Sequence, residues 1–183
     1  VFHQRFVGVL EGGIRIDAFH HPLAHPLLAI QFAHFVEDHA AFEPLARGTN
    51  LAAGLDFLAR VSRRRSVVFL VSDFLAQGWE RAMQIVQRRH DLVAVVVSDP
   101  AERALPPVGV LLLEDLESGV VVELDTAGAA GRALARRARQ AAEQRALALR
   151  RLSVDTVEIA TDRPYVDALI AFFKARAKRM AHG

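Results

Sequence analysis

The 183-residue chain contains no cysteine, and aromatic residues make up only 7% of it. Without cysteine the chain can form neither disulfide bonds nor thiolate metal sites, and it has no thiol nucleophile. No apolar run approaches the roughly 18 residues that a membrane-spanning helix requires, and no secretory signal pattern is recognisable. The net charge is only +2, which excludes a strong overall attraction to nucleic acid. We therefore expect a soluble, cytoplasmic protein.

Several nucleotide-binding and catalytic motifs are also missing. The sequence has no Gly-x-x-x-x-Gly-Lys-Ser/Thr loop, no Gly-x-Gly-x-x-Gly fingerprint and no Gly-x-Ser-x-Gly elbow. These absences exclude P-loop nucleotide hydrolases, the common dinucleotide-binding enzymes and the α/β-hydrolases.

Apolar residues, by contrast, make up 52% of the chain, which is enough for a large core in one domain. The runs Val67–Val71 and Leu92–Val97 are short and rich in β-branched residues, so each predicts a buried strand. The other predicted β elements are a hairpin around Gly12-Gly13, a hairpin around Glu117–Gly119 and a strand after Ser153. The first three predicted helices are one after Pro26, one with Leu51, Leu55, Leu58 and Val61 on one face, and one lined by Trp79, Met83 and Val86. Two more are a helix over Gly131–Leu152 with Leu134, Ala138, Ala141 and Leu152 near one stripe, and a final helix with Val166, Leu169, Ile170 and Phe173 inward. Buried strands alternating with helices predict a doubly wound α/β fold, with a mostly parallel sheet and helices on both faces.

Both buried strands end in the same polar pair, Ser72-Asp73 and Ser98-Asp99. In doubly wound folds, ligands bind beyond the carboxyl ends of strands, where the strand order reverses. Asp73 could therefore be a Mg²⁺ ligand, together with the hydroxyl of Thr49 in the preceding loop. Equally, Thr49 could be a helix N-cap and Asp73 a turn or cap residue. Asp99 and Glu102 flank Pro100 in a pattern that also fits the first turn of a short helix.

Two further groups of residues could bind ligands. The arginine-rich segment Arg132–Arg151 could contact nucleic acid, but it contains no aromatic residue for base stacking and Glu143 dilutes its charge. A solvated helix face is the alternative. Five histidines lie between His20 and His39, yet intervening prolines and unfavourable spacing argue for a polar segment rather than a zinc site.

The region from about Gly48 to Phe173 resembles the bacterial family called domain of unknown function 58 (DUF58). The resemblance rests on five short motifs: Gly-Thr-x-Leu (Gly48–Leu51), Ser-Asp-Phe (Ser72–Phe74), Arg-His-Asp (Arg89–Asp91), Asp-Pro-x-Glu (Asp99–Glu102) and Asp-x-Glu-x-Gly (Asp115–Gly119). Proteins of this family carry a von Willebrand factor A-like domain and are typically encoded beside MoxR-type AAA ATPases.

The resemblance implies a metal-ion-dependent adhesion site with an Asp-x-Ser-x-Ser loop, a threonine and an aspartate. The last two correspond to Thr49 and Asp73, but the Asp-x-Ser-x-Ser loop and the strand before it are not in this sequence. We therefore expect residues 1–183 to be a single von Willebrand A-like domain that is incomplete at its N-terminus. Two unpaired strand edges should then lie inside the sheet. Mg²⁺ binding by this chain alone is doubtful.

The leading functional hypothesis is a non-enzymatic protein-interaction module. It would dock a partner, by resemblance a MoxR-type AAA ATPase, at the carboxyl edge of the sheet, in chaperone-like assembly or maturation of other proteins. Ser72, Asp99 and Glu102 are candidate contacts there, beside Thr49 and Asp73 as metal ligands. The alternatives are a Mg²⁺-dependent phosphohydrolase that uses Asp73 and Asp99, and a nucleic-acid-binding protein that uses the Arg132–Arg151 helix.

Overall fold

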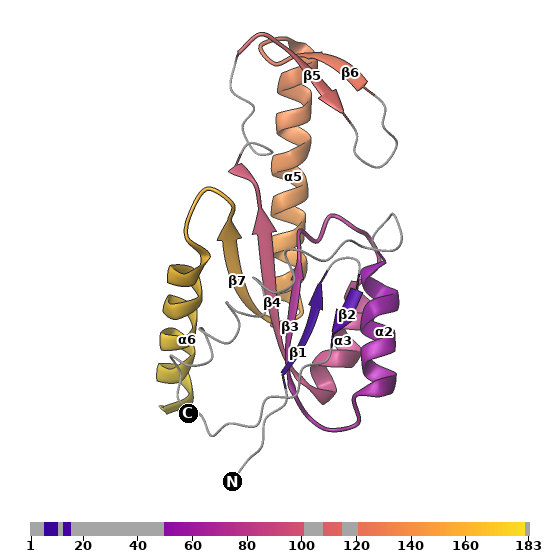
Figure 1. Ribbon diagram of the computed structural model, residues 1–183, viewed down its shortest axis with the longest axis vertical. Helices are drawn as coiled ribbons and strands as arrows, with labels where there is room; N and C mark the ends of the chain where they lie inside the picture. The colour runs from indigo at the N-terminus through magenta and orange to yellow at the C-terminus, as the bar shows by residue number, and fades with distance from the viewer. Residues whose placement is uncertain (1–5, 11–12, 16–49, 101–107, 115–120, 182–183) are drawn as a thin grey trace.

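The computed structural model describes residues 6–10, 13–15, 50–100, 108–114 and 121–181. The main sheet has five strands in the order β2-β1-β3-β4-β7 (Figure 1). These strands are β1 (Phe6–Leu10), β2 (Gly13–Arg15), β3 (Val67–Ser72), β4 (Asp91–Ser98) and β7 (Asp155–Ala160). Only β2 is antiparallel to its neighbour, so the predicted mostly parallel sheet and the first hairpin are both confirmed.

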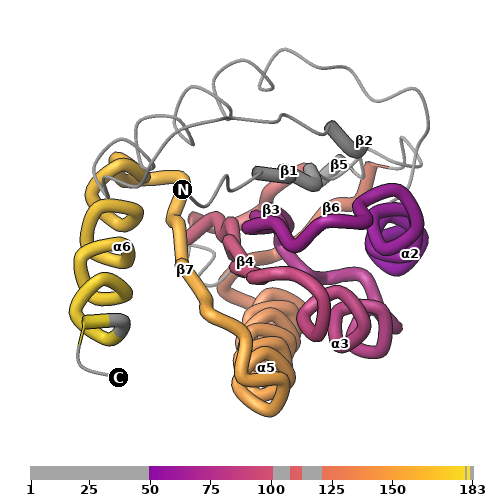
Figure 2. The backbone as a smooth tube through the Cα atoms, turned by 90° about the horizontal axis from the view of Figure 1, so that it is seen from below, coloured from indigo at the N-terminus to yellow at the C-terminus, as the bar shows by residue number. Residues whose placement is uncertain are grey.

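Helices cover both faces of this sheet (Figure 2). The helices are α2 (Leu51–Val61), α3 (Glu80–Arg89), α5 (Ala129–Arg151) and α6 (Tyr165–Ala181). The first three lie on one face and α6 lies on the other. No helix in the described part of the chain is long and apolar enough to cross a membrane. The helix predicted after Pro26 lies outside the described residues.

β3 explains why the sequence between Ser66 and Ser72 is so apolar. All six of its residues are buried. Val68 and Leu70 pack with α2 and α3, whereas Val67, Phe69 and Val71 belong to the cluster on the α6 side. Because a parallel strand covered on both faces needs apolar residues at every position, the alternation typical of a half-exposed strand is absent.

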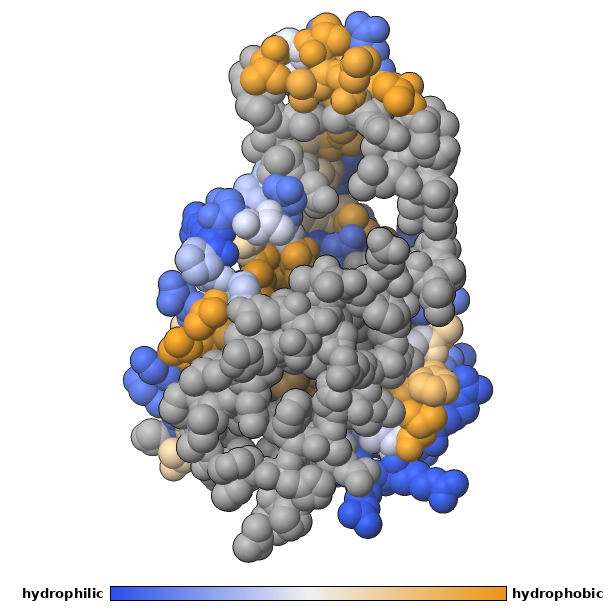
Figure 3. Space-filling model, in the orientation of Figure 1, coloured by the Kyte–Doolittle hydropathy of each residue, from blue (hydrophilic) through white to orange (hydrophobic). Residues whose placement is uncertain are grey.

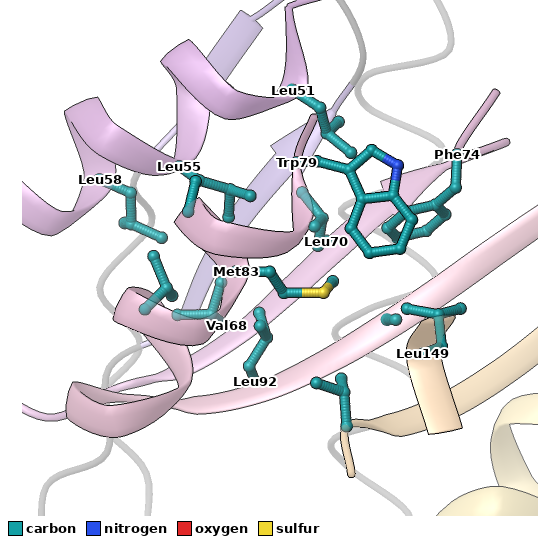
Figure 4. Close-up of a cluster of buried hydrophobic side chains, with 14 of the residues drawn as sticks. Leu51, Leu55, Leu58, Val68, Leu70, Phe74, Trp79, Met83, Leu92 and Leu149 are labelled. Atoms are coloured by element: carbon teal, nitrogen blue, oxygen red, sulfur yellow. The ribbon is translucent and has the colours of Figure 1, made fainter. Parts of the chain in front are cut away.

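The larger of the two apolar clusters lies between the sheet and α2, α3 and the end of α5 (Figure 4). Met83 of α3 is fully buried at its centre, and Trp79, directly before α3, is 3% exposed. Leu51, Leu55 and Leu58 of α2 are buried as predicted. Val61 is 43% exposed, so its predicted inward position is wrong. It is the last residue of α2, where the chain turns away toward the arginines that precede β3.

The face opposite this cluster is packed by α6. Leu169 and Phe173 are buried there, and the Phe173 ring contacts Phe69 edge-to-face, with centroids 6.0 Å apart. Ile170 is 36% exposed, so its predicted inward position is wrong. It follows Leu169 directly, and consecutive helical residues point about 100° apart, which turns Ile170 out of the contact.

A separate two-stranded sheet stands beyond the main one. Its strands, β5 (Val110–Glu114) and β6 (Val121–Asp125), are antiparallel, as the predicted second hairpin requires. Figure 1 shows this hairpin beside the N-terminal end of α5, which extends past the main sheet. Leu134, predicted to lie near one stripe of this helix, is in that projecting half of α5 and is 41% exposed. Leu149, near the other end of α5, is buried in the main core.

The predicted pair of open strand edges is not found in the described sheet. β1 and β3 are hydrogen-bonded parallel neighbours, with Phe6 opposite Val67 and Leu10 opposite Val71. Two parallel strands present complementary rows of N–H and C=O groups, so direct pairing removes the cost of leaving them unsatisfied. The expectation of unpaired edges between these strands is therefore wrong.

Candidate functional site

The carboxyl ends of β3, β4 and β7 lie next to one another at one edge of the sheet. Ser72 is in register with Val96, and Ser98 is in register with Ala160. The structure therefore brings the two predicted Ser-Asp pairs to adjacent strand ends. Both pairs occupy the edge at which parallel sheets place their ligands.

The turn after β3 is built by the side chains of Ser72 and Asp73. The Phe74 backbone N–H donates to Ser72 Oγ at 2.9 Å, and the Leu75 backbone N–H donates to Asp73 Oδ1 at 2.8 Å. These bonds satisfy two backbone donors where the strand ladder stops. Asp73 thus has a structural role in the turn, which was one of its two predicted interpretations.

Phe74 lets the chain reverse at this point. Its φ angle is +57°, in the left-handed region that residues with a side chain rarely occupy. The conformation points the ring into the core, where it is 4% exposed and contacts Trp79 edge-to-face at a centroid distance of 5.2 Å (Figure 4). The packing of the two rings offsets the backbone strain and keeps the Ser72–Trp79 turn in one shape.

Arg145 of α5 also holds this turn, and the sequence patterns did not identify it as a site residue. Its Nη1 donates a hydrogen bond to the backbone carbonyl of Asp73 at 2.7 Å. A signal was available, because Arg145 precedes the buried Leu149 by four residues and so shares its helix face. Nothing else in the sequence distinguishes it from the other arginines of α5.

The second strand end is arranged differently. The side chain of Ser98 is buried, and its Oγ donates a hydrogen bond to the Ile159 carbonyl at 3.5 Å. Asp99 is exposed, and apart from Pro100 the short helix predicted after it lies outside the described residues. Glu102, the remaining predicted contact at this edge, lies outside the described residues.

The predicted metal ligands cannot be brought together from the described residues. Thr49 lies outside them, and the N-cap of α2 is Asn50, whose Oδ1 accepts from the Ala53 backbone N–H at 2.9 Å. The alternative interpretation of Thr49 as the cap is therefore wrong. In the described part of the chain, no three His, Cys, Asp or Glu side chains form a group that could hold a metal ion. Asp73 Oδ1 accepts a backbone N–H in the turn, and the second oxygen of this carboxylate, Oδ2, is of the type that Mg²⁺ prefers, so the Mg²⁺ site stays a prediction.

A cleft of about 640 Å³ lies at this edge, between the ends of β4 and β7 and the beginning of α6. Its volume falls within the roughly 300–1,000 Å³ typical of ligand-binding clefts. Ser98 lines it, but Ser72, Asp73 and Asp99 do not. Apolar groups of Ile159, Pro164 and Tyr165 form part of its wall.

The polar part of this wall is mainly acidic. Glu158, Asp162 and Asp167 contribute carboxylates and are all exposed. Arg163 is the one basic residue of the lining, and its Nε lies 3.8 Å from Asp162 Oδ1. None of these residues was predicted as a site residue, because the chain after β7 matches no catalytic or ligand-binding motif. Only their position in the last residues of a strand and in the segment after it could have indicated them.

The order of the strands removes one of the reasons for expecting a ligand-binding site at this edge of the sheet. β1, β3, β4 and β7 follow one another across the sheet in a single direction, so the parallel strands of the described sheet have no point of reversal. The predicted crevice at a reversal point is therefore absent there. The cleft instead arises because α6 crosses to the opposite face of the sheet after β7.

The Arg-His-Asp motif lies at the opposite edge, where β4 begins. Arg176 of α6 bridges two strand starts, since its Nη2 pairs with Asp91 and its Nη1 lies 3.0 Å from Asp155 Oδ2. His90 is 3% exposed, and neither of its ring nitrogens has a hydrogen-bond partner among the described residues. Burial, reinforced by the neighbouring Arg89 guanidinium, lowers the pKa of the His90 imidazole. This motif fastens strands and helices together at the edge away from the cleft.

Comparisons with known proteins identify the family. The family model described as "Protein of unknown function DUF58" matches residues 27–146. The chain is 33% identical over 130 residues to "Uncharacterized protein Rv1480" of Mycobacterium tuberculosis, and the match covers 70% of this chain and 41% of that protein. It is 29% identical over 136 residues to "Uncharacterized protein MAV169" of Mycobacterium avium, covering 74% of this chain and 80% of that protein.

Among solved structures, the conserved hypothetical protein BatB from Bacteroides thetaiotaomicron aligns with a TM-score of 0.47 at 13% identity, over 97% of this chain and 82% of that one. The chain spans about two fifths of the length of the Rv1480 protein. A family match over well more than half of the residues establishes the relationship, and the chain belongs to the DUF58 family.

Proposed function

We propose that this chain is a non-enzymatic protein-interaction module that docks its partner at the carboxyl edge of the main sheet. The observation that carries the proposal is the cleft between β4, β7 and α6, which is the right size for a few side chains of a partner. The turn after β3 lies at the same edge of the sheet but does not line the cleft, and its backbone is fixed by the Ser72 and Asp73 side chains, which lowers the entropy lost if a partner also contacts it.

The lining of the cleft favours a particular kind of partner segment. Three exposed carboxylates, on Glu158, Asp162 and Asp167, surround apolar atoms of Ile159 and Tyr165. A lysine or arginine next to an apolar side chain would complement both features. Charge complementarity of this kind raises the association rate and discriminates against acidic partners.

The partner class follows from the family resemblance. A MoxR-type AAA ATPase is our proposed partner, and the joint task is chaperone-like assembly or maturation of other proteins. A carboxylate of the ATPase or its client could complete a metal site that includes Thr49 and Asp73. Mg²⁺ is therefore part of the proposal only as a bridging ion in the complex.

Titration calorimetry with a purified MoxR-type AAA ATPase tests the cleft. Asp162→Lys and Glu158→Lys should each weaken association about tenfold, because each replaces an attractive charge by a repulsive one. Asp56→Lys is the matched control, since it makes the same charge change at an exposed position of α2. Equal weakening by all three variants would indicate a general effect of net charge and would contradict docking at the cleft.

A second arm tests the turn after β3 and the metal. Mg²⁺ should strengthen the association of wild type relative to EDTA, and it should not strengthen that of the Thr49→Ala, Asp73→Ala double variant. If association is unchanged in both buffers, the role given to these two residues is wrong, whatever the cleft variants show.

Two alternatives have less support. A phosphohydrolase would use Asp73 and Asp99 at adjacent strand ends, but Asp73 Oδ1 already accepts a hydrogen bond from the turn after β3. Mg²⁺-dependent turnover of an aryl phosphate that is lost in Asp73→Asn would favour a phosphohydrolase. Nucleic-acid binding would use the exposed arginines of α5, yet that helix has no aromatic residue. Binding that falls steeply with salt would favour this second alternative.

A further inference from the structure

The hairpin of β5 and β6 carries four large apolar side chains that are more than half exposed, those of Val110, Leu112, Val121 and Val122. Leu112 is 73% exposed, Val110 is 58% exposed and Val121 is 57% exposed. In Figure 3 these strands form the orange region at the top of the molecule. The register puts Leu112 opposite Glu123 and Val110 opposite Asp125, so the exposed apolar side chains alternate with carboxylates across the hairpin. Exposed apolar side chains on an ordered element mark a candidate interaction site.

The hairpin is held firmly to the rest of the chain. The backbone N–H and the hydroxyl of Thr126 both donate to the Gly109 carbonyl, at 2.9 and 2.7 Å. Asp125 Oδ1 accepts the Ala127 N–H at 3.0 Å, and Arg132 of α5 donates to the Ala127 carbonyl. These bonds close the base of the hairpin against the first turn of α5, so the apolar patch has a defined orientation.

Each strand of the hairpin also has a free edge. In the part of the chain that the structure describes, β5 pairs only with β6 and β6 only with β5. A two-stranded sheet is marginally stable alone, and an apolar edge strand invites a further strand to pair with it.

The charges of the two strands decide which edge can pair with its own copy. If β6 paired antiparallel with a second β6 over its full length, Glu123 would face Glu123, and like charges directly opposite each other are destabilising. If β5 paired in the same way, Leu112 would face Leu112, and the register would place position 111 opposite position 113 and position 110 opposite position 114. No like charges meet in this second arrangement.

We propose that β5 is a dimerisation strand, and that two copies of this chain join through antiparallel β5–β5 pairing centred on Leu112. The result is a four-stranded sheet with the order β6-β5-β5-β6. The pairing is two-fold symmetric, so it closes at the dimer. Glu123 at the centre of β6 keeps the outer edges from extending the sheet further.

Charge-swapped variants at the symmetry centre test the proposal. Leu112→Lys and Leu112→Glu should each raise the dimer dissociation constant about 30-fold or more, because each places like charges opposite each other at the interface centre. Mixing the two variants should restore a dimer that contains one copy of each, because Lys then faces Glu. Leu75→Lys is the matched control, since Leu75 is 55% exposed but lies in the turn after β3; it should leave the dimer unchanged.

Sedimentation equilibrium gives the dissociation constants, native mass spectrometry gives the composition of the mixed dimer, and far-ultraviolet circular dichroism confirms that each variant is folded. The proposal is overturned if wild type stays monomeric at high concentration, or if its patch is covered only by a different protein. It is also overturned if mixing the two Leu112 variants gives no mixed dimer. Growth into larger assemblies would indicate β5–β6 pairing between copies and would equally overturn it.

Discussion

Gly131 lies where the first turn of α5 meets the hairpin, and it provides the sharpest test of that junction. A Cβ atom at this position would lie 2.4 Å from the Thr126 carbonyl oxygen and 2.6 Å from Thr126 Cα. Both neighbours are backbone atoms, so neither can rotate away as a side chain would. Gly131→Ala should therefore force α5 and the hairpin apart.

The expected size of this effect follows from two opposing contributions. Replacing glycine by alanine inside a helix ordinarily stabilises the protein by about 0.5–1 kcal/mol. Overpacking against atoms that cannot move costs about 1–3 kcal/mol. The steric contribution is the larger one here, so we expect a net loss of about 1–2 kcal/mol and a melting temperature lower by about 2–8 °C.

Thermal and urea unfolding followed by circular dichroism measure the net change. Hydrogen exchange then locates it, because the Thr126 amide should lose protection when its bond to the Gly109 carbonyl lengthens. Ala130→Gly, at the exposed neighbouring position, should cost no more than about 1 kcal/mol and leave that amide protected. A Gly131→Ala protein that is more stable than wild type would refute the close contact between α5 and the hairpin.

Two pairs of substitutions, each a buried or partly buried position with an exposed control, test the rest of the structure. Arg176→Met leaves Asp91 and Asp155 side by side without the cation that they share, so the free energy of unfolding in urea should fall by about 2–3 kcal/mol. Arg179→Met changes a position that is 62% exposed, so the free energy of unfolding should fall by less than about 1 kcal/mol. Met83→Ala should cost about 2–5 kcal/mol because the side chain is fully buried, and equal losses for Met83→Ala and the exposed Ile85→Ala would contradict the core as described.

Because the folded-state pKa of His90 lies below its unfolded value of about 6.5, the unfolded chain binds more protons between these two values. Stability should therefore fall as the pH drops below about 6.5, and His90→Leu should flatten this dependence when urea midpoints are compared with those of wild type.

The parts of the fold that the sequence predicts well are those with strong local patterns. Val67–Val71 is apolar at every position and bounded by charged residues, so no other element fits it. The spacing of Trp79, Met83 and Val86 similarly leaves only one helix face. Burial is continuous along the strand and repeats with the helical period in the helix, so in both cases the local pattern is enough to predict the element.

The remaining features depend on contacts between distant residues. Nothing near Phe6 in the sequence specifies that β1 pairs with β3. Val61 and Leu134 fit the apolar stripes of their helices but lie where those helices leave the core. A periodic pattern shows which face of a helix is apolar, yet where along the helix the covering surface stops is set by the rest of the fold.

In the candidate site, too, some residues could be predicted from local patterns and others depend on contacts between distant residues. Asp73 could be placed at a strand end because the end of an apolar run is a local signal. The cleft beside it could not be predicted, because it depends on how α6 packs across β7, and its residues Glu158 and Asp162 have no distinctive spacing. Arg145 reaches the Asp73 carbonyl from 72 residues away, and several other arginines of α5 would have been equally good candidates.

Phe74 constrains how the turn at the carboxyl edge can change during evolution. A glycine there would relieve the left-handed backbone by about 1 kcal/mol, but it would remove the ring that packs on Trp79, at a cost of about 3–5 kcal/mol. A substitution that suits the backbone therefore harms the core, and one that keeps the ring keeps the strain. Related proteins that dock different partners should for this reason vary at the solvent-facing Leu75 and Gln77 while Phe74 and Trp79 change together or not at all.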